Sequence, residues 1–143
     1  MKCDQLSIFL ENRAGRLAEV TRLLSESKVN IRALSLADTS DFGILRLIVS
    51  DFEKAQKVLK DAGFTVGKTS VVAVVVDDHP GGLHNLLHLL RDSGINVEYM
   101  YAFVQQSGSN AVIIFRFDKT EQAIELLTEK KIKMIPGNEL SQL

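Results

Sequence analysis

One segment of this chain occurs twice, 66 residues apart, and this repeat limits the folds that are open to the sequence. Gly15 recurs as Gly81, and the leucines and the asparagine that follow recur at the same step. In both places an apolar segment leads into a glycine-containing loop and then into an amphipathic helix. A repeat of this length fixes the architecture. The 143 residues are therefore predicted to form two small domains, 1–69 and 70–143.

Within each copy, the hydrophobic pattern predicts the element order β-α-β-β-α-β. Alternating apolar residues indicate strands, and apolar residues three or four positions apart indicate one face of a helix. The predicted helix stripes are Leu17, Val20, Thr21 and Leu24 in the first copy, and Leu83, Leu86, Leu87 and Leu90 in the second. The predicted strands are 5–10, 29–37, 44–49 and 64–68, followed by 71–76, 95–105, 111–117 and 132–135.

This order predicts an α+β protein of two ferredoxin-like βαββαβ units, with antiparallel sheets that carry helices on one face. Turn-forming residues at 38–43 and 106–110 separate the second and third strands of the two copies. The strand at 71–76 is apolar on both faces, so we expect its helix-free face to be covered as well. Two arrangements remain open: helix-free faces packed together, or sheets joined edge to edge, within the chain or in a homodimer.

The second helix of each copy has a capping-box pattern at its start. Ser50 is followed by Glu53, and Asp118 is followed by Glu121. In such a pattern the first side chain accepts a hydrogen bond from the helix backbone and the glutamate reaches back. Ser50 and Asp118 are therefore predicted to be N-cap residues.

Composition and charge exclude several classes of protein. The net charge is −1 and there is no block of basic residues, which argues against nucleic-acid binding. The single cysteine, Cys3, excludes an internal disulfide, and we expect it in a frayed terminus. No segment approaches the roughly 20 apolar residues of a membrane span, and no signal core opens the chain. The sequence predicts a cytoplasmic protein without a membrane partner.

The two glycine-containing loops have the chemistry of a small-anion site. Glycine lets a ligand approach the backbone closely, and the first N–H groups of a helix lack internal partners and attract anions. Asn30 and Asn96 begin the next strand, which we expect to lie beside the same loops. An asparagine offers both a donor and an acceptor. Together these groups suit the carboxylate and ammonium of an α-amino acid.

The loop and strand residues resemble the signature of ACT domains. The matching segments are Asn12-Arg13-Ala14-Gly15-Arg16-Leu17 with Val29-Asn30-Ile31, and His79-Pro80-Gly81-Gly82-Leu83 with Ile95-Asn96-Val97. The resemblance covers nearly the whole chain as two tandem copies. ACT domains are small ferredoxin-like regulatory modules that bind amino acids between paired domains, through the loop after the first strand and the start of the second. The resemblance assigns ligand contact to Asn12, Arg13, Ala14, Gly15, Arg16, Leu17, Asn30 and Ile31 in the first copy, and to Asp78, His79, Pro80, Gly81, Gly82, Leu83, Asn96 and Val97 in the second.

By this resemblance, the chain is a non-catalytic sensor of a small amino acid that forms a homodimer and regulates an amino-acid biosynthetic enzyme. We expect no cofactor and no catalytic residue. His84 and His88 have a spacing that can hold a metal, but no cysteine or glutamate nearby completes a set, so we expect no metal site.

Three alternatives remain open at the level of sequence. The glycines and asparagines can serve only as turn residues. The chain can be a ligand-free interaction module for an amino-acid metabolic enzyme. The same fold also serves acylphosphatase-like hydrolases, for which Arg13 or Arg16 would cradle a phosphate, although fold analogy is a weak warrant for activity.

Overall fold

The computed structural model covers residues 1–143 and describes residues 1–38, 40–103 and 110–143. The chain divides into two compact units. The N-terminal unit comprises Asp4–Thr69 with Gln142, and the C-terminal unit comprises Ser70–Ser141 with Met1–Cys3 and Leu143. The predicted turn at 106–110 and the end of the strand at 95–105 lie largely outside the described residues, as does residue 39 of the first turn.

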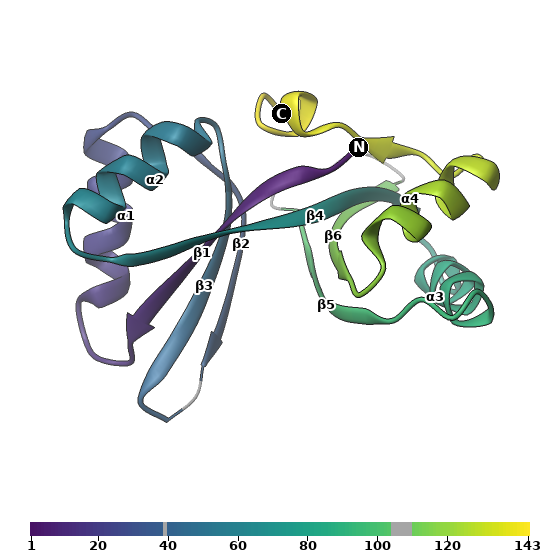
Figure 1. Cartoon of the computed structure of the whole chain (residues 1–143), viewed down its shortest axis with the longest axis horizontal. Helices are drawn as coiled ribbons and strands as arrows, with labels where there is room; N and C mark the ends of the chain where they lie inside the picture. Colours follow the sequence, from purple (N-terminus) through teal and green to yellow (C-terminus); the bar gives the residue numbers. More distant parts are fainter. Residues whose placement is uncertain (39, 104–109) are drawn as a thin grey trace. The chain divides into compact units, whose positions relative to one another are not determined.

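The N-terminal unit is a βαββαβ unit, drawn in purple to teal in Figure 1. Its strands follow the spatial order β2-β3-β1-β4, with β1 and β2 each antiparallel to β3. Leu6 of β1 and Leu34 of β2 both pair with Leu47 of β3. The elements are β1 (Cys3–Glu11), α1 (Arg16–Glu26), β2 (Ile31–Asp38), β3 (Phe42–Val49), α2 (Phe52–Asp61) and the first part of β4 (Thr65–Asp77).

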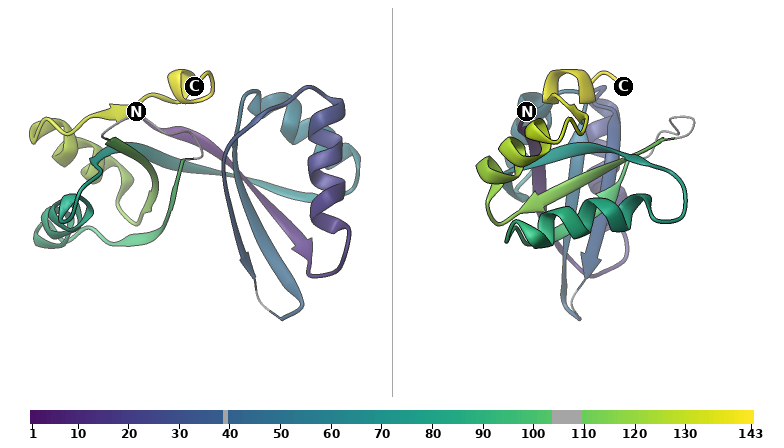
Figure 2. Two further views of the ribbon diagram at one scale, coloured as in Figure 1. Left: turned by 180° about the vertical axis from the view of Figure 1, so that it is seen from behind. Right: turned by 90° about the vertical axis from the view of Figure 1, so that its right-hand side faces the viewer.

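The C-terminal unit repeats the same topology, with the spatial order β5-β6-β4-β7. Val74 of β4 pairs with Ile113 of β6 on one side and with Met134 of β7 on the other. Figure 2 shows this unit from two further directions. After β4 come α3 (Gly82–Asp92), β5 (Val97–Ala102), β6 (Asn110–Phe117), α4 (Thr120–Glu129), β7 (Met134–Ile135) and a short α5 (Gly137–Leu140). The predicted α+β class with two ferredoxin-like units is confirmed.

Each unit has its own hydrophobic core between one sheet face and its two helices. In the N-terminal unit, Val20 and Leu24 of α1 and Leu59 of α2 pack with the inward residues of β1 and β3. In the C-terminal unit, Leu90 of α3 and Leu127 of α4 pack with β4 and β6 in the same way. Burial of each such side chain stabilises the unit by about 1.5–3 kcal/mol relative to exposure. The predicted stripe of α1 is wrong at Leu17 and Thr21, which are both exposed.

All four long helices end in the same hydrogen-bonded turn. The residue after each cap has a positive φ: Lys28 and Lys131 at 59°, Gly63 at 90° and Gly94 at 70°. The next residue donates its N–H to a carbonyl five residues earlier, as Val29 does to Leu24 at 2.9 Å. This is the Schellman motif, in which an apolar residue closes the helix onto the core. Two of the four ends therefore place a lysine in a conformation that favours glycine.

The predicted N-caps of α2 and α4 are wrong. Asp51, not Ser50, caps α2, and its carboxylate accepts a hydrogen bond from Lys54 N at 3.1 Å. Lys119 occupies the cap position of α4, without a side-chain hydrogen bond to the helix. Ser50 and Asp118 instead bind the backbone at the start of the second strand of their unit. A capping-box pattern does not distinguish these two uses of the same side-chain oxygen.

Two further expectations from the sequence are corrected. Cys3 is not frayed: it lies in β1, is buried, and its Sγ is 3.5 Å from the carbonyl oxygen of Ile135. The predicted strands 64–68 and 71–76 form one continuous strand, β4, which begins at Thr65 and runs through Thr69 and Ser70 without a turn. How the helix-free sheet faces are covered stays a prediction.

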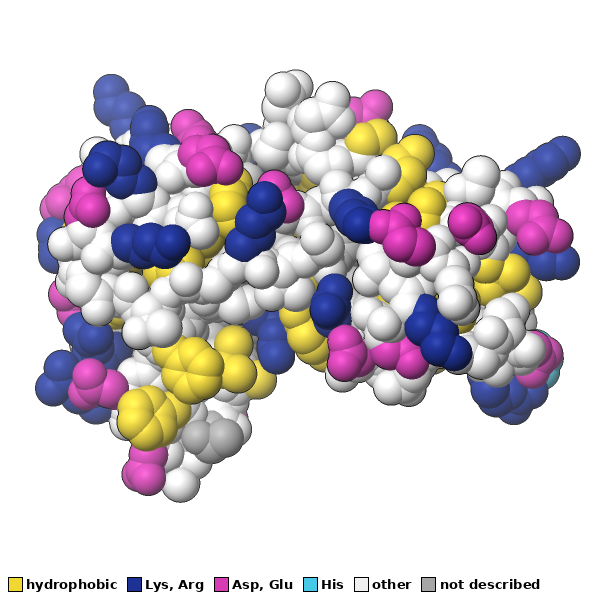
Figure 3. All heavy atoms as spheres, viewed as in Figure 1, with side chains coloured by type: hydrophobic (Ala, Val, Ile, Leu, Met, Phe, Trp, Pro, Cys, Tyr) yellow, Lys and Arg dark blue, Asp and Glu magenta, His cyan; other side chains and the backbone are white. Residues whose placement is uncertain are grey.

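Large hydrophobic side chains are exposed on the sheet of the N-terminal unit. Phe9 and Phe42 are 55% and 51% exposed, and Leu34 and Leu36 on the edge strand β2 are 47% and 52% exposed. Figure 3 shows hydrophobic side chains gathered near the β2–β3 hairpin. The register places Phe9 and Phe42 on the helix-free face, and Leu34 and Leu36 on the opposite face, so we refer to Phe9 and Phe42 as the β2–β3 apolar patch.

Candidate functional site

The predicted loop glycines adopt the conformation that the loop requires. Gly15 and Gly81 have φ of 90° and 91°, are the N-cap residues of α1 and α3, and make no side-chain cap. A Cβ built on either glycine meets nothing within 4 Å. The repeated glycines therefore place both helix starts next to open space.

The backbone at both helix starts retains donors without acceptors. Gly82 N donates to His79 O at 3.0 Å in the turn before α3, and the first helical bond, from Asn85 N to Gly81 O, is 2.9 Å. Between them, the N–H groups of Leu83 and His84 have no acceptor in the described part of the chain. The same holds for the second and third residues of α1. Such groups, with the helix dipole behind them, attract a carboxylate.

The residues before Gly15 have contacts within their own unit. Asn12 donates its backbone N–H to Asp41 O at 2.8 Å and its side-chain amide to Ser40 O at 3.3 Å. Arg13 Nε lies 3.1 Å from a carboxylate oxygen of Glu11. Asn12 thus holds the loop against the β2–β3 hairpin, and Ala14 beside it is exposed.

Arg16 is engaged more fully. Its guanidinium contacts Glu19 at 2.8 Å and Glu11 at 3.9 Å, and lies 4.6 Å from the ring centroid of Phe64. Only 22% of its side chain is exposed. Because Arg13 and Arg16 both face carboxylates, no observation favours the hydrolase alternative, which needs an arginine turned towards a phosphate.

The second loop is more open. Asp78 is exposed. His79 Nδ1 lies 2.9 Å from Pro80 O, and His79 Nε2 lies 3.7 Å from Asp77 Oδ2. Gly82, which occupies the position of Arg16 in the repeat, is buried. A Cβ on Gly82 would lie 2.0 Å from Asp77 O, so only glycine fits at this helix start.

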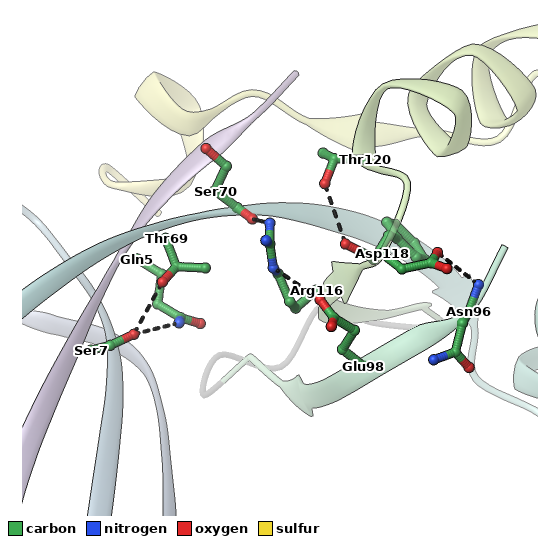
Figure 4. A network of polar contacts seen from close by, with 10 residues as sticks. Gln5, Ser7, Thr69, Ser70, Asn96, Glu98, Arg116, Asp118 and Thr120 are labelled. Carbon is green, nitrogen blue, oxygen red and sulfur yellow. Dashed lines mark hydrogen bonds and ion pairs between the residues drawn. The ribbon is translucent and has the colours of Figure 1, made fainter.

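The asparagines that precede β2 and β5 have equivalent surroundings. Asn30 N donates to Ser50 Oγ at 2.9 Å, and Asn96 N donates to Asp118 Oδ1 at 2.9 Å. Figure 4 shows the Asn96 contact, with the side-chain amide turned away from Asp118. Both asparagine side chains are exposed. The backbone is therefore fixed while the amide groups face outward.

Within one unit, the structure does not bring the loop and the asparagine together. The loop after β1 lies beside the β2–β3 hairpin, where Glu11 pairs with Phe42. Asn30 lies at the other end of the sheet, where Ile31 pairs with Val49. The intervening helix of 11 residues spans about 16 Å at 1.5 Å per residue. The expectation that Asn30 and Asn96 lie beside the loops of their own unit is wrong, because β1 and β2 run in the same direction.

The remaining predicted residues fall into two groups. Ile31 and Val97 are half-buried and pack against the cores of their units. Leu17 is 40% exposed at the start of α1, whereas Leu83 at the start of α3 is half-buried. The branched side chains after each asparagine thus anchor the strand rather than face solvent.

The structure also shows a cavity that sequence reasoning missed. It has a volume of about 440 Å³, and Lys131, Lys133, Asn85 and Asn110 contribute to its wall together with Gly82. Lys131 and Lys133 both follow the end of α4. Nothing in the sequence distinguishes them from ordinary solvent-exposed lysines. Only the spatial approach of this segment to the start of α3 identifies them.

Other site classes find no support among residues 1–38, 40–103 and 110–143. No group of three or more metal-ligating side chains is assembled there. His88 Nε2 lies 3.1 Å from Asp92 Oδ2, and its Nδ1 lies 3.0 Å from Arg91. In the same residues, no helix is both long and apolar enough to span a bilayer.

Two βαββαβ units, each with an uncapped glycine at the start of its first helix, make this chain a tandem of ferredoxin-like modules. The chain belongs to the ACT domain pair family, whose model matches residues 1–143. The resemblance found in the sequence is thereby confirmed.

Similar proteins agree with this assignment. A crystal structure of protein BT0572 from Bacteroides thetaiotaomicron is 43% identical, with a TM-score of 0.95 over 100% of this chain and 98% of that one. The acetolactate synthase small subunit of Buchnera aphidicola subsp. Baizongia pistaciae (strain Bp) is 34% identical over 77 residues. That match spans 54% of this chain and 48% of the small subunit.

More distant structures share the fold. The ligand-free regulatory subunit of aspartate kinase from Thermus thermophilus is 14% identical, with a TM-score of 0.64 over 88% of this chain and 91% of that one. At this identity, the likeness concerns the arrangement of the elements alone.

Proposed function

We propose that this chain is a non-catalytic regulatory protein that binds a small amino acid through its ACT modules. The functional modules of this proposal are residues 1–69 and 70–143. The observation that carries it is the pair of helix starts at Gly15 and Gly81, with open space beside each glycine and unpaired N–H groups behind it. These groups suit the α-carboxylate of an amino acid.

The ammonium of the ligand would be received by an asparagine. The outward-facing side-chain carbonyls of Asn30 and Asn96 are suitable acceptors. Because each asparagine lies about a helix length from the loop of its own unit, a complete site needs the loop of one module and the asparagine of another. Pairing of modules, in this chain or in a homodimer, would then respond to the ligand in proportion to its differential affinity for the paired state.

A regulatory role rather than catalysis is supported by the site and by the relatives. The loops offer backbone N–H donors and asparagine amides, which suit reversible binding of a small polar ligand. The acetolactate synthase small subunit, similar over about half its length, is by its name a subunit of an enzyme. A partner enzyme of amino-acid metabolism is part of the proposal.

Isothermal titration calorimetry of the full chain against the twenty amino acids tests the proposal. We expect one small group of amino acids to bind, and Asn96→Ala to weaken binding by about tenfold, because a hydrogen bond to a charged group is lost. Asn138→Ala, which changes an exposed asparagine on α5, is the matched control. A folded protein that gives no heat with any of the twenty would refute the proposal.

The β2–β3 apolar patch favours a second candidate function, a ligand-free interaction module. Exposed phenylalanines such as Phe9 and Phe42 are suited to contact with a protein partner. In that case an amino-acid biosynthetic enzyme would co-purify with the wild-type chain and not with Phe42→Glu, and calorimetry with amino acids would be silent. Co-purification that is unchanged in Phe42→Glu, or binding of an amino acid by the wild-type chain, would contradict this second candidate.

A further inference from the structure

The cavity of the C-terminal unit lies where three segments meet. The C-terminal end of β4, the start of α3 and the connection from α4 to β7 supply its wall, and Asn110 at the start of β6 completes it. Val75 N donates to Lys133 O at 2.9 Å, which fixes the connection beside β4. A cavity of about 440 Å³ lies in the usual size range of small-molecule sites.

The charged groups of this cavity are two cations and one anion. Lys131 and Lys133 come from the α4–β7 connection, and Asp77 comes from the end of β4. No carboxylate among the described residues lies within 4.0 Å of either lysine ammonium, whereas Asp77 contacts only His79 as an ion pair, at 3.7 Å. Asn85 and Asn110 add amide groups to the wall. The wall therefore offers two positions for carboxylates and one for an ammonium.

In the first copy of the repeat, side chains occupy the positions that match this cavity. There, Arg16 stands at the position of Gly82, and its guanidinium lies over Phe64 between Glu11 and Glu19. These residues match Ile132, Asp77 and Asn85 of the second copy in the repeat. The second copy has a glycine in place of this arginine, and an amide in place of one of the carboxylates that hold it.

The lysine at 131 stands where the first copy has Gly63, and both residues have positive φ. A non-glycine residue is strained in this conformation. The chain thus places an ammonium at the cavity wall in a position where glycine would be more stable.

We infer that this cavity binds a small dicarboxylate, and in particular an acidic α-amino acid of the size of glutamate. The side-chain carboxylate lies with Lys131 and Lys133, and the ammonium lies with Asp77. The α-carboxylate lies at the start of α3, beside Gly82; in this last contact the inference rests on the proposed function. Unlike the site completed by Asn30 or Asn96, this one is contained in a single unit.

Calorimetry of the full chain with L-glutamate, L-aspartate, L-glutamine and succinate tests the inference. We expect the acidic amino acids to bind at least about tenfold more tightly than L-glutamine, because the neutral amide does not pair with an ammonium. Succinate, which lacks the ammonium, reports whether Asp77 contributes. Weaker binding of succinate than of L-aspartate supports the inference, and equal binding would overturn the assignment of an amino acid to this cavity.

Three variants locate the site. Lys131→Gly removes an ammonium and relieves the positive φ, so it is expected to weaken L-glutamate binding about tenfold without lowering the unfolding temperature. Asn85→Glu places a carboxylate in the cavity wall, where it would pair with the lysines in place of the ligand. This variant is therefore expected to abolish L-glutamate binding. Lys130→Gln, an exposed neighbour outside the cavity wall, changes the net charge equally and is the matched control with unchanged affinity.

The outcomes separate this inference from the proposed function. Binding of a neutral amino acid that is unaffected by Lys131→Gly and lost in Asn96→Ala would overturn the inference and leave the proposed function standing. Glutamate binding that is lost in Lys131→Gly and retained in Asn96→Ala would support the inference. It would show that glutamate binds in the cavity and not in the site that Asn96 completes. An equal loss in Lys130→Gln would show a general charge effect and overturn the inference.

Discussion

Adjacent glycines at the start of α3 are expected to resist substitution for different reasons. Gly81 needs its positive φ of 91° but has open space around it, whereas Gly82 lies in the helix with no room for a side chain. A Cβ on Gly82 would lie 2.0 Å from the carbonyl oxygen of Asp77 and 3.0 Å from its carbon. Gly82→Ala therefore requires the backbone at the end of β4 to move.

The magnitudes follow from these contacts. Gly81→Ala places alanine in the left-handed region at a cost of about 1–2 kcal/mol, offset by about 0.4–1 kcal/mol from the restricted unfolded chain, so the net loss is about 1 kcal/mol. Gly82→Ala forces a backbone shift of the kind that costs about 3 kcal/mol when a packed region is overfilled, and the helix preference of alanine returns at most about 1 kcal/mol. The net loss is about 2 kcal/mol.

Thermal unfolding followed by tyrosine fluorescence measures this difference. The chain has two tyrosines and no tryptophan, and both tyrosines lie in β5 of the C-terminal unit, so the signal reports on the unit that contains the substitutions. At about 4–8 °C per kcal/mol for a domain of this size, we expect Tm to fall by about 4–8 °C in Gly81→Ala and about 8–16 °C in Gly82→Ala. A Gly82→Ala protein as stable as Gly81→Ala would refute the steric argument.

Three further outcomes follow from the polar contacts of the structure. Arg116→Met removes a guanidinium that lies 3.3 Å from Glu98 and donates to a backbone carbonyl at 2.9 Å. We expect the free energy of unfolding of the C-terminal unit in urea to fall by about 1–2 kcal/mol, and by less than about 1 kcal/mol in Glu98→Gln. Asp118→Ala removes the acceptor of Asn96 N–H and is expected to cost about 1 kcal/mol by the same assay, with no effect contradicting the assigned contact. Cys3 is 2% exposed, so we expect it to react with a thiol reagent only when the unit opens. Comparison of the reaction rates of the native and the urea-unfolded protein measures this protection.

The repeat made the topology of both units predictable. Apolar alternation located the strands, and leucine spacing located the helices, because both cores are built from one sheet face and one helix stripe. The glycine loops were recognisable for the same reason: Gly15 and Gly81 hold a backbone conformation that few other residues adopt.

The errors arose where a side chain has more than one local use. Ser50 and Asp118 precede helices in a capping pattern, yet their oxygens accept bonds from the neighbouring strand. Thr21 fits the helix stripe by spacing but lies at its edge, in solvent. The cavity beside Lys131 depends on which segments meet in space, and no spacing along the chain encodes that.

The assignment of residues 1–3 to the C-terminal unit constrains how this protein can be made. Cys3 contacts Ile135 across 132 positions of sequence, and Lys2 forms an ion pair with Glu121. During translation, this end of the chain emerges long before its partners, so the C-terminal unit cannot mature until synthesis has passed residue 135. Expressing the two halves as separate polypeptides, cut at residue 69, would leave the second without Met1–Cys3, and so without the contacts of Cys3 and Lys2. Fragment complementation, rather than dissection, is the route to studying either half.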